Sequence, residues 1–319
     1  SFEVNILMNR TNMNQNTKQP LFAHLSLLGA ATFWGLMAPL GKDAMNNGIN
    51  GVALVMFRIL GGATLFWLAS LFVQKENVCR KDIFLFMLAA ILGLICNQCC
   101  YTIGLSFTSP INAGIITTTM PIFALILSAL ILKEPITPKK AIGVALGFSG
   151  AVLLISTSLR MSGASGVGSI KGDLLCLGAQ LSYTLYLTIF NKLVKRYSAF
   201  TINKWMFLWA TLLLFPFAFP SVQAISFSQI SIKTYLEVGY VVVFGTFICY
   251  LLMISGQRVL RPTVVSMYNY MQPVVATIVS VSLGLAALTF NHFIAVVLIF
   301  IGVWLVVRSK SKRDISSSR

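Results

Sequence analysis

The stretches GLICNQCCYTIGLSFTSP, residues 93–110, and GTFICYLLMISGQRVLRP, residues 245–262, decide the expected fold of this chain. They align without a gap at an offset of about 152 residues. The aligned glycines and prolines are Gly93 with Gly245, Gly104 with Gly256, Pro110 with Pro262, Pro121 with Pro273 and Gly150 with Gly302. Glycine and proline fix backbone geometry, so these matches indicate shared architecture rather than shared hydrophobicity. Two matching halves are typical of a transporter.

The composition places the chain in a membrane. Of its 319 residues 57% are hydrophobic and 10% charged, and the mean hydropathy is +0.83, which a water-soluble core of this size does not need. A membrane-spanning helix requires roughly 20 apolar residues. The chain offers ten such runs, near residues 21–41, 52–73, 83–105, 111–132, 141–158, 173–193, 202–220, 235–256, 263–284 and 291–308.

The basic residues gather in alternate loops. The net charge of +16 would also suit a nucleic-acid-binding protein, but this distribution argues against nucleic acid as a partner. If the N-terminus is cytoplasmic, 19 of the 24 Lys and Arg residues lie on the inner side, and Lys42, Arg160, Lys171 and Lys233 lie outside. The positive-inside rule therefore predicts an even number of spans with both termini cytoplasmic.

Five spans in each half imply that the halves enter the membrane from opposite sides. The loops agree, because the break at residues 109–110 is uncharged whereas its counterpart at residues 261–262 is basic. The sequence therefore predicts an all-α integral membrane protein of ten transmembrane helices, arranged as two inverted five-helix repeats.

These boundaries divide the chain into five segments. The first is polar and lacks the apolar stretch of a cleavable signal peptide. The expected segments are a cytoplasmic tail at 1–20, a first repeat at 21–158, an external Gly- and Ser-rich linker at 159–172, a second repeat at 173–308 and a basic cytoplasmic tail at 309–319.

Several motifs resemble those of EamA-type members of the drug/metabolite transporter superfamily. They are Gly29-Ala-Ala-Thr-Phe-Trp-Gly35 followed by Lys42, Phe57-Arg58, Gly104-Leu-Ser-Phe-Thr-Ser-Pro110 and Leu132-Lys-Glu134-Pro-Ile-Thr137. The resemblance covers about residues 21–308 and implies a bacterial inner-membrane exporter of small metabolites, often amino acids, with a cavity between the halves. One departure is Ala286, which stands where the first half has Glu134. We expect Glu134 to face the loop, so this departure leaves transport possible.

Polar residues inside the apolar runs are the candidates for substrate binding. Such groups are costly in a membrane unless they face protein, water or substrate. The candidates are Asn97, Gln98 and Tyr101 in the third span, Thr117 and Thr118 in the fourth, and Tyr268, Asn269 and Gln272 in the ninth. Their spacing would let them form a polar chamber with aromatic walls. The alternative is hydrogen bonding between helices.

Aromatic residues repeat this pattern. At an offset of about 149, which holds nearer the N-terminus, Trp34 matches Tyr183, and Tyr186 follows Tyr183 on the same helical face. Tyr250 in the eighth span belongs with this group. Two roles are open to these side chains: stacking against a ligand, or ordinary packing against neighbouring helices.

Arg58 is a charged residue about seven positions into the second span. Three roles are open to it: an ion pair with Asp43, a bond to a carbonyl at a helix end, or neutralisation of a substrate carboxylate.

Pro121 and Pro273 are the candidate gating residues. Proline interrupts a span and frees a carbonyl, which permits a bend. Since the two are repeat partners, equivalent bends on opposite sides would open the two entrances alternately.

The acidic residues bear on energy coupling. All eight lie in tails, in loops or near span ends, which favours a facilitator or exchanger over a carboxylate-based proton antiporter. The rival classes are a polytopic membrane enzyme and a receptor without solute flux. Since no familiar metal, phosphate-loop or triad signature occurs, we do not expect an enzyme.

No cofactor or metal is expected either. The spacing of Cys96, Cys99 and Cys100 lacks an accompanying His or second Cys pair, so they are interpreted as packing residues. The expected partners are a small-molecule substrate and the lipid bilayer. Gly143, Gly147 and Gly150 predict a close helix contact, within a monomer or at the seam of a homodimer.

Overall fold

The computed structural model describes residues 2–108, 110–162, 169–282 and 289–310. Its helices, in chain order, are α1 (Phe2–Asn46), α2 (Gly51–Ala69), η1 (Ser70–Phe72), α3 (Arg80–Ala90), η2 (Ile91–Cys96), α4 (Asn97–Phe107), α5 (Pro110–Thr117), α6 (Met120–Ile131), α7 (Pro138–Ser162), α8 (Ile170–Ile189), α9 (Asn191–Val194), α10 (Ala199–Gln223), η3 (Phe227–Gln229), α11 (Ile232–Val242), η4 (Val243–Ile248), α12 (Cys249–Val259), α13 (Pro262–Met267), η5 (Tyr268–Tyr270), α14 (Met271–Ser282) and α15 (Phe290–Val307). Ala286, residues 163–168 of the predicted linker and residues 311–319 of the predicted tail lie outside the described residues.

Eight helical runs within the described residues are long and apolar enough to cross a membrane. They are Pro20–Asn46, Gly51–Phe72, Arg80–Phe107, Ala113–Ile131, Pro138–Thr157, Ala199–Gln223, Ile232–Val259 and Phe290–Val307. Large apolar side chains such as Phe72, Phe217 and Phe290 are more than three-quarters exposed, at 91%, 79% and 76%, as suits a surface in contact with lipid. The run α13 to α14 and helix α8 are not among the eight, so ten spans stays a prediction. Helix α8 carries a buried polar series, including Gln180, which lowers its hydropathy.

Polar caps mark where helices begin. The side chain of Asn50 accepts a hydrogen bond from the amide of Ala53 at 2.8 Å, and that of Ser198 accepts one from Thr201 at 3.3 Å. Each bond satisfies an amide that has no partner within the first turn. The capping residues Asn50 and Ser198 therefore determine where α2 and α10 begin.

The backbone repeats at the offset seen in the sequence. The run α3–η2–α4 and the run α11–η4–α12 each interrupt an α-helix with a six-residue π-helical segment. All three parts of the second run have the lengths of their counterparts in the first and begin 152 residues later. Because π-helical segments cluster at functional sites, this shared irregularity directs attention to the neighbourhood of both.

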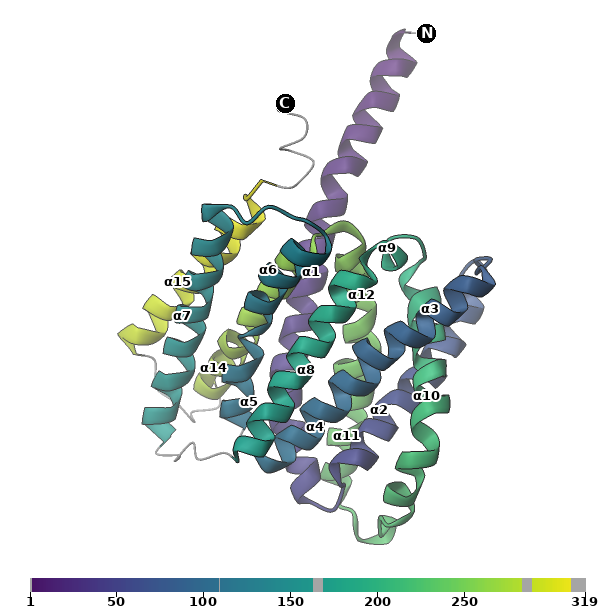
Figure 1. The fold of residues 1–319 in the computed structure, drawn as a ribbon, viewed down its shortest axis with the longest axis vertical. Coiled ribbons are helices and arrows are strands. Elements are labelled where there is room, and N and C mark those ends of the chain that lie inside the picture. The colour runs from purple at the N-terminus through teal and green to yellow at the C-terminus, as the bar shows by residue number, and fades with distance from the viewer. Residues whose placement is uncertain (1, 109, 163–168, 283–288, 311–319) are drawn as a thin grey trace.

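The two halves of the chain interlock. Helix α1 packs on α12 and α14 of the second half, whereas α8 packs on α4 and α6 of the first. Helix α7 pairs with α15 at one edge of the bundle, and α2 pairs with α10 toward the opposite edge (Figure 1). Helices at corresponding positions therefore pack on each other at the two edges, and α1 and α8 pack on corresponding partners of the opposite half.

The contact between α7 and α15 depends on glycine. A Cβ atom added to Gly302 would lie 2.6 Å from the carbonyl oxygen of Gly143, and one added to Gly150 would lie 2.8 Å from that of Ala295. The two contacts are equivalent in the repeat, because at an offset of 152 residues Gly143 corresponds to Ala295 and Gly150 to Gly302. The glycines of α7 therefore face a helix of the same chain, which is the intramolecular one of the two expected contacts.

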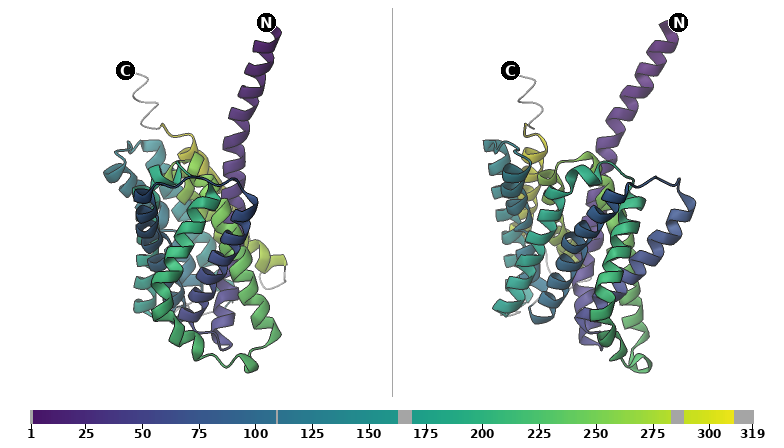
Figure 2. Two further views of the ribbon diagram at one scale, coloured as in Figure 1. Left: turned by 90° about the vertical axis from the view of Figure 1, so that its right-hand side faces the viewer. Right: turned by 45° about the vertical axis from the view of Figure 1, so that its right-hand side comes forward.

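The loops at one end of the bundle are tied together by polar contacts. Helix α1 projects beyond the bundle at the end where α9 lies and where α15 terminates (Figures 1 and 2). There Asp82 accepts hydrogen bonds from Arg196 and Tyr197, each at 2.6 Å, and Glu76 accepts from the amide and hydroxyl of Ser198, each at 2.9 Å to one oxygen. Burial raises the pKa of Glu76, but hydrogen bonds from Thr201 and Ser198 outweigh it, so this pKa lies below its usual value.

Candidate functional site

A cavity lies inside the bundle, with about 530 Å³ of empty space when the part open to solvent is counted, and both halves contribute to its walls. The first half contributes α1, α2, α4 and the turn between α5 and α6, and the second contributes α8, α12, η5 and α14. The lining residues are Trp34, Met37, Arg58, Asn97, Gln98, Tyr101, Thr117, Met120, Gln180, Tyr183, Tyr250, Asn269 and Gln272.

Most candidates from the sequence meet at this cavity. The candidates that line it are Trp34, Arg58, Asn97, Gln98, Tyr101, Thr117, Tyr183, Tyr250, Asn269 and Gln272. The structure brings them together, and substrate binding by them stays a prediction.

Three candidates lie away from the lining. Thr118 is fully buried and donates its hydroxyl to the carbonyl of Ile115. The hydroxyl of Tyr268 lies 2.6 Å from Nδ1 of His24, which ties η5 to α1. Tyr186, which is 1% exposed, packs behind Tyr183 with the ring centroids 5.5 Å apart.

Three lining residues are absent from the sequence prediction: Met37, Met120 and Gln180. Each lies three residues from a candidate on the same helix or turn, namely Trp34, Thr117 and Tyr183. Helical spacing would have identified Gln180. A methionine inside an apolar run carries no signal that separates a cavity wall from ordinary packing.

An aromatic wall closes one side of the cavity. The ring of Trp34 meets Tyr183 and Tyr250 edge to face, with centroids 6.3 Å and 5.9 Å apart. The indole Nε1 donates to the carbonyl of Gly245 in η4 at 3.0 Å, and the hydroxyl of Tyr250 lies 3.5 Å from the carbonyl of Gly93 in η2. The two π-helical segments therefore anchor this wall, one from each half.

Amide side chains form much of the remaining lining. Asn97 donates to the carbonyl of Ala179 at 3.0 Å, and Gln272 donates to Asn269 at 2.9 Å. Gln98 donates to the hydroxyl of Tyr250 at 3.1 Å, but its carbonyl oxygen Oε1 has no partner although the residue is 1% exposed. A buried acceptor without a donor is costly, so Gln98 Oε1 is suited to receive a hydrogen bond from a bound solute.

Arg58 brings a positive charge to the cavity. It is 4% exposed, and its Nε donates to Thr246 Oγ1 at 3.1 Å. Thr246 in turn donates to the carbonyl of Val241 at 2.9 Å, across the π-helical segment η4. Of the three roles left open, the ion pair with Asp43 is not observed, because Asp43 bonds Lys233 at 2.6 Å. The observed partner is a hydroxyl rather than a carbonyl.

The cavity is closed toward the end of the bundle where α9 lies. The hydroxyl of Tyr186 donates to Gln257 Oε1 at 3.2 Å, and Gln257 Nε2 donates to the hydroxyl of Tyr183 at 3.0 Å. Gln257 also lines a second, narrow hollow between α8, α9, α12 and α13. The three side chains therefore separate the central cavity from this second hollow.

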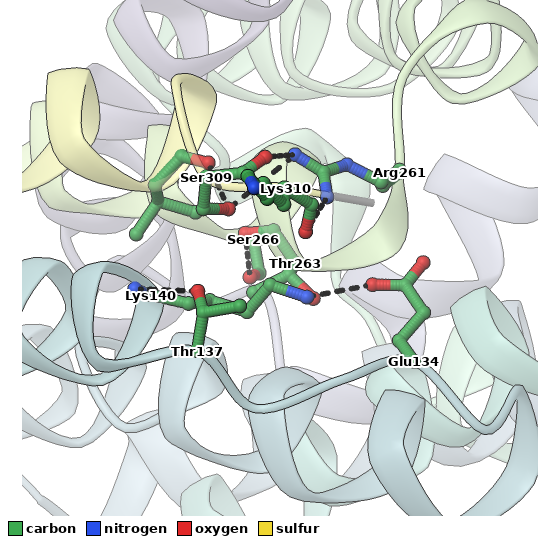
Figure 3. Close-up of polar contacts among 9 residues, drawn as sticks. Glu134, Thr137, Lys140, Arg261, Thr263, Ser266, Ser309 and Lys310 are labelled. Carbon is green, nitrogen blue, oxygen red and sulfur yellow. Dashed lines mark hydrogen bonds and ion pairs between the residues drawn. The ribbon is translucent and has the colours of Figure 1, made fainter. Parts of the chain in front are cut away.

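Two polar groups, one from each half, lie side by side where the loop after α6 meets α13 (Figure 3). Lys140, 1% exposed, pairs with Glu134 at 2.9 Å, and Glu134 is 11% exposed, so the expectation that it faces the loop is wrong. Figure 3 shows this pair beside Thr263 of α13, with Arg261 bonded to Ser309 at the end of α15. Both groups lie apart from the cavity lining.

The two candidate gating prolines lie just after breaks in their helices. Pro121 is in the first turn of α6, after a turn at residues 118–119, and Pro273 is in the first turn of α14, after the 3₁₀ segment η5. A missing amide costs little in a first turn. The interruption that we predicted at each proline therefore lies a few residues earlier, next to the cavity.

Comparison with known proteins gives concordant matches. The model of the EamA-like transporter family matches residues 21–156 and 170–308. Two Bacillus subtilis proteins, uncharacterized transporters YetK and YyaM, are 25% and 23% identical, covering 93% and 88% of this chain and 90% and 92% of theirs. The uncharacterized inner membrane transporter YhbE of Escherichia coli is 27% identical over 63% of each chain. A solved structure described as "Crystal structure of protein" superposes with a TM-score of 0.69 at 18% identity, covering 90% of this chain and 95% of its own, and shares the fold.

Proposed function

Because this chain belongs to the EamA-like transporter family and is a multi-pass membrane transporter, we propose that it exports a small metabolite such as an amino acid. The solute binds in the central cavity and crosses by alternating access. The cavity is the observation that supports this proposal, since both halves line it and its wall includes Gln98 Oε1, a buried acceptor without a protein partner.

The proposed architecture is two inverted five-helix repeats spanning the membrane ten times, in a bacterial inner membrane with both termini cytoplasmic. The matched runs α3–η2–α4 and α11–η4–α12 support the repeat. The paired contacts Gly143 with Gly302 and Gly150 with Ala295 support two-fold symmetry between the halves. The printed name of the E. coli relative supports the location.

The proposed inner gate is the group Tyr183, Gln257 and Tyr186. For the cavity to open toward the second hollow, the two hydrogen bonds of Gln257 must break and the phenol rings must separate. The helix breaks before Pro121 and Pro273 lie beside the lining residues Met120 and Gln272, so they provide places where the walls bend. When the cavity wall bends at one break and opens one entrance, the other break closes the opposite entrance.

Solute flux tests the transport proposal. The purified protein is reconstituted in liposomes loaded with labelled amino acids, and release is followed with and without a pH gradient. We expect faster release than from loaded liposomes that lack the protein. This release should not require a pH gradient, because the described acidic residues lie outside the cavity. Strict dependence on a gradient would overturn the facilitator mechanism, and chemical turnover without flux would favour an enzyme.

Side-specific labelling tests the topology. In a background lacking the native cysteines, Ser169→Cys before α8 and Lys310→Cys after α15 place exposed thiols at opposite ends of the second repeat. An impermeant maleimide added to intact cells should label the first and spare the second. Labelling of both from the same face would exclude an odd number of spans between them and, with it, the inverted arrangement.

A further inference from the structure

The guanidinium of Arg58 is a buried cation with unused donors. A guanidinium has five N–H donors, and here one of them is bonded, through Nε to Thr246. The terminal nitrogens have no hydrogen bond to the described residues, and the side chain lines the cavity while being 96% buried, since its exposure is 4%. A buried charge without a counter-ion is strongly destabilising, so this arrangement needs a compensating function.

The acidic side chains that the structure describes are all engaged elsewhere. Their partners are Lys233 for Asp43 and Glu237, Ser198 for Glu76, Arg196 for Asp82, Lys140 for Glu134 and Thr108 for Asp173. The described lining contains amides, hydroxyls, aromatic rings and two thioethers besides Arg58, and no carboxylate. Without solute, the cavity therefore carries one net positive charge.

We infer that Arg58 binds the carboxylate of the transported solute, and that the cavity selects organic monoanions over zwitterions, neutral molecules and cations of the same shape. This inference rests on the proposed transport function and narrows its substrate class from small metabolites, zwitterionic amino acids included, to organic monoanions. A monoanion yields a neutral complex with Arg58, and the paired N–H groups of the guanidinium match a carboxylate in geometry. A zwitterion leaves the uncompensated positive charge in the cavity, and a cation adds a second one.

The other walls specify the body of the solute. Trp34, Tyr183 and Tyr250 present aromatic faces and edges, which suits a flat apolar group. Gln98 Oε1 is the free acceptor, and it takes an N–H or O–H of the solute. Arg58 is bonded to Thr246 and Gln98 to Tyr250, four residues further on, so one run of chain positions both polar groups.

Probes that share one body and differ in charge test the inference. Binding to the full-length protein in detergent at neutral pH is measured by thermal shift for 3-phenylpropionate, phenylalanine, 3-phenylpropionamide and phenethylamine, which are an anion, a zwitterion, a neutral amide and a cation. We expect 3-phenylpropionate to bind at least tenfold more tightly than each of the others. In Arg58→Gln its affinity should fall by about tenfold to a hundredfold, with affinity for the amide unchanged.

A matched variant and a stability measurement separate binding from folding. Arg258→Gln removes an exposed arginine of α12 and should leave all four affinities as in the wild type. The ligand-free Arg58→Gln protein should melt at or above the wild-type temperature, because an uncompensated buried charge has been removed. A clearly lowered melting temperature would assign Arg58 to folding and overturn the inference.

The remaining outcomes distinguish this inference from the transport proposal. Equal binding of the four probes, no binding of 3-phenylpropionate, or unchanged binding in Arg58→Gln would overturn the anion site. In liposomes, flux of phenylalanine that is insensitive to Arg58→Gln would overturn the anion site and leave transport standing. Absence of flux for every labelled solute would overturn the transport proposal itself.

Discussion

The runs α3–η2–α4 and α11–η4–α12 follow the same backbone course and carry different side chains. In the first, Asn97 and Gln98 present amides to the cavity. In the second, Thr246 and Tyr250 present hydroxyls that hold Arg58 and Gln98. The position of Thr246 corresponds, 152 residues earlier, to the fully buried Leu94. The hydroxyl that supports the buried charge therefore exists in one half alone.

The charge itself shows the same asymmetry. At the offset of about 149 that aligns Trp34 with Tyr183, Arg58 falls on Phe207, whose ring packs edge to face on Tyr250 with centroids 5.2 Å apart. A duplicated scaffold thus supports a site that is not duplicated. Substitutions at backbone contacts that both halves share should therefore change the free energy of unfolding equally in the two halves. Substitutions around Arg58 should not have an equivalent in the other half.

The largest effect is expected where the halves are most alike. Gly150→Ala and Gly302→Ala each force a Cβ atom against backbone atoms of the facing helix, which cannot move without separating α7 from α15. We expect each to lower the free energy of unfolding by about 3 kcal/mol, measured by thermal unfolding in detergent. Gly239→Ala, with open space around its Cβ, is the control and should not destabilise. A marked difference between Gly150 and Gly302 would break the comparison.

A smaller effect should separate the two π-helical segments. A Cβ on Gly93 would lie 2.8 Å from Cγ of Tyr186, a ring held by Gln257, whereas a Cβ on Gly245 would lie 3.0 Å from the flexible Met37. We expect Gly93→Ala to cost about 2 kcal/mol and Gly245→Ala less than about 1 kcal/mol in the same measurement. Equal costs would show that neighbour rigidity does not distinguish the segments.

Removing the hydroxyl that supports Arg58 should cost less again. Thr246→Val leaves the Arg58 Nε–H without its partner, and we expect a loss of about 1–2 kcal/mol in the free energy of unfolding. Thr64→Val removes an exposed hydroxyl bonded to its own helix and is the control. In an Arg58→Gln background the cost of Thr246→Val in the free energy of unfolding should shrink. An unchanged cost would show that the two residues are not energetically coupled.

The smallest effect concerns the loops that lead into the two runs. Glu76 precedes α3, and the corresponding position before α11 is Ser228. Since the pKa of Glu76 is lowered in the folded state, its stabilisation is present above the ordinary glutamate pKa of about 4.3 and is lost as the pH falls through the folded pKa. The melting temperature should therefore exceed that of Glu76→Gln at neutral pH and converge with it in acid. A constant difference across this range would contradict the assignment.

Sequence patterns predict the scaffold well because hydropathy and the glycine and proline positions constrain the backbone directly. The repeat of Gly93 and Gly245 indicates matched helices, and both prove to lie in π-helical segments. The π-helical geometry itself is not predictable from these residues, since the surrounding composition is that of an ordinary apolar helix. Its detection requires the structure.

Side-chain placement is predicted less completely, because spacing fixes which residues share a face but not how the helix is rotated. Tyr183 and Tyr186 share a face, yet Tyr183 lines the cavity and Tyr186 lies behind it. The buried pair of Glu134 with Lys140 is likewise not predictable from spacing, because Glu134 lies in the loop after α6 and Lys140 in the first turn of α7. Charged residues near a span end read as exposed until the packing around them is known.

The hydrogen bond from Gln98 to Tyr250 joins two residues that occupy the same position in their respective repeats. Under the proposed mechanism, the two repeats exchange conformations when the cavity changes its access from one side of the membrane to the other. Such an exchange maps this pair onto itself, so its backbone separation is the same before and after. In that mechanism the pair marks the axis that relates the two repeats, and its hydrogen bond is one that the change of conformation does not have to break.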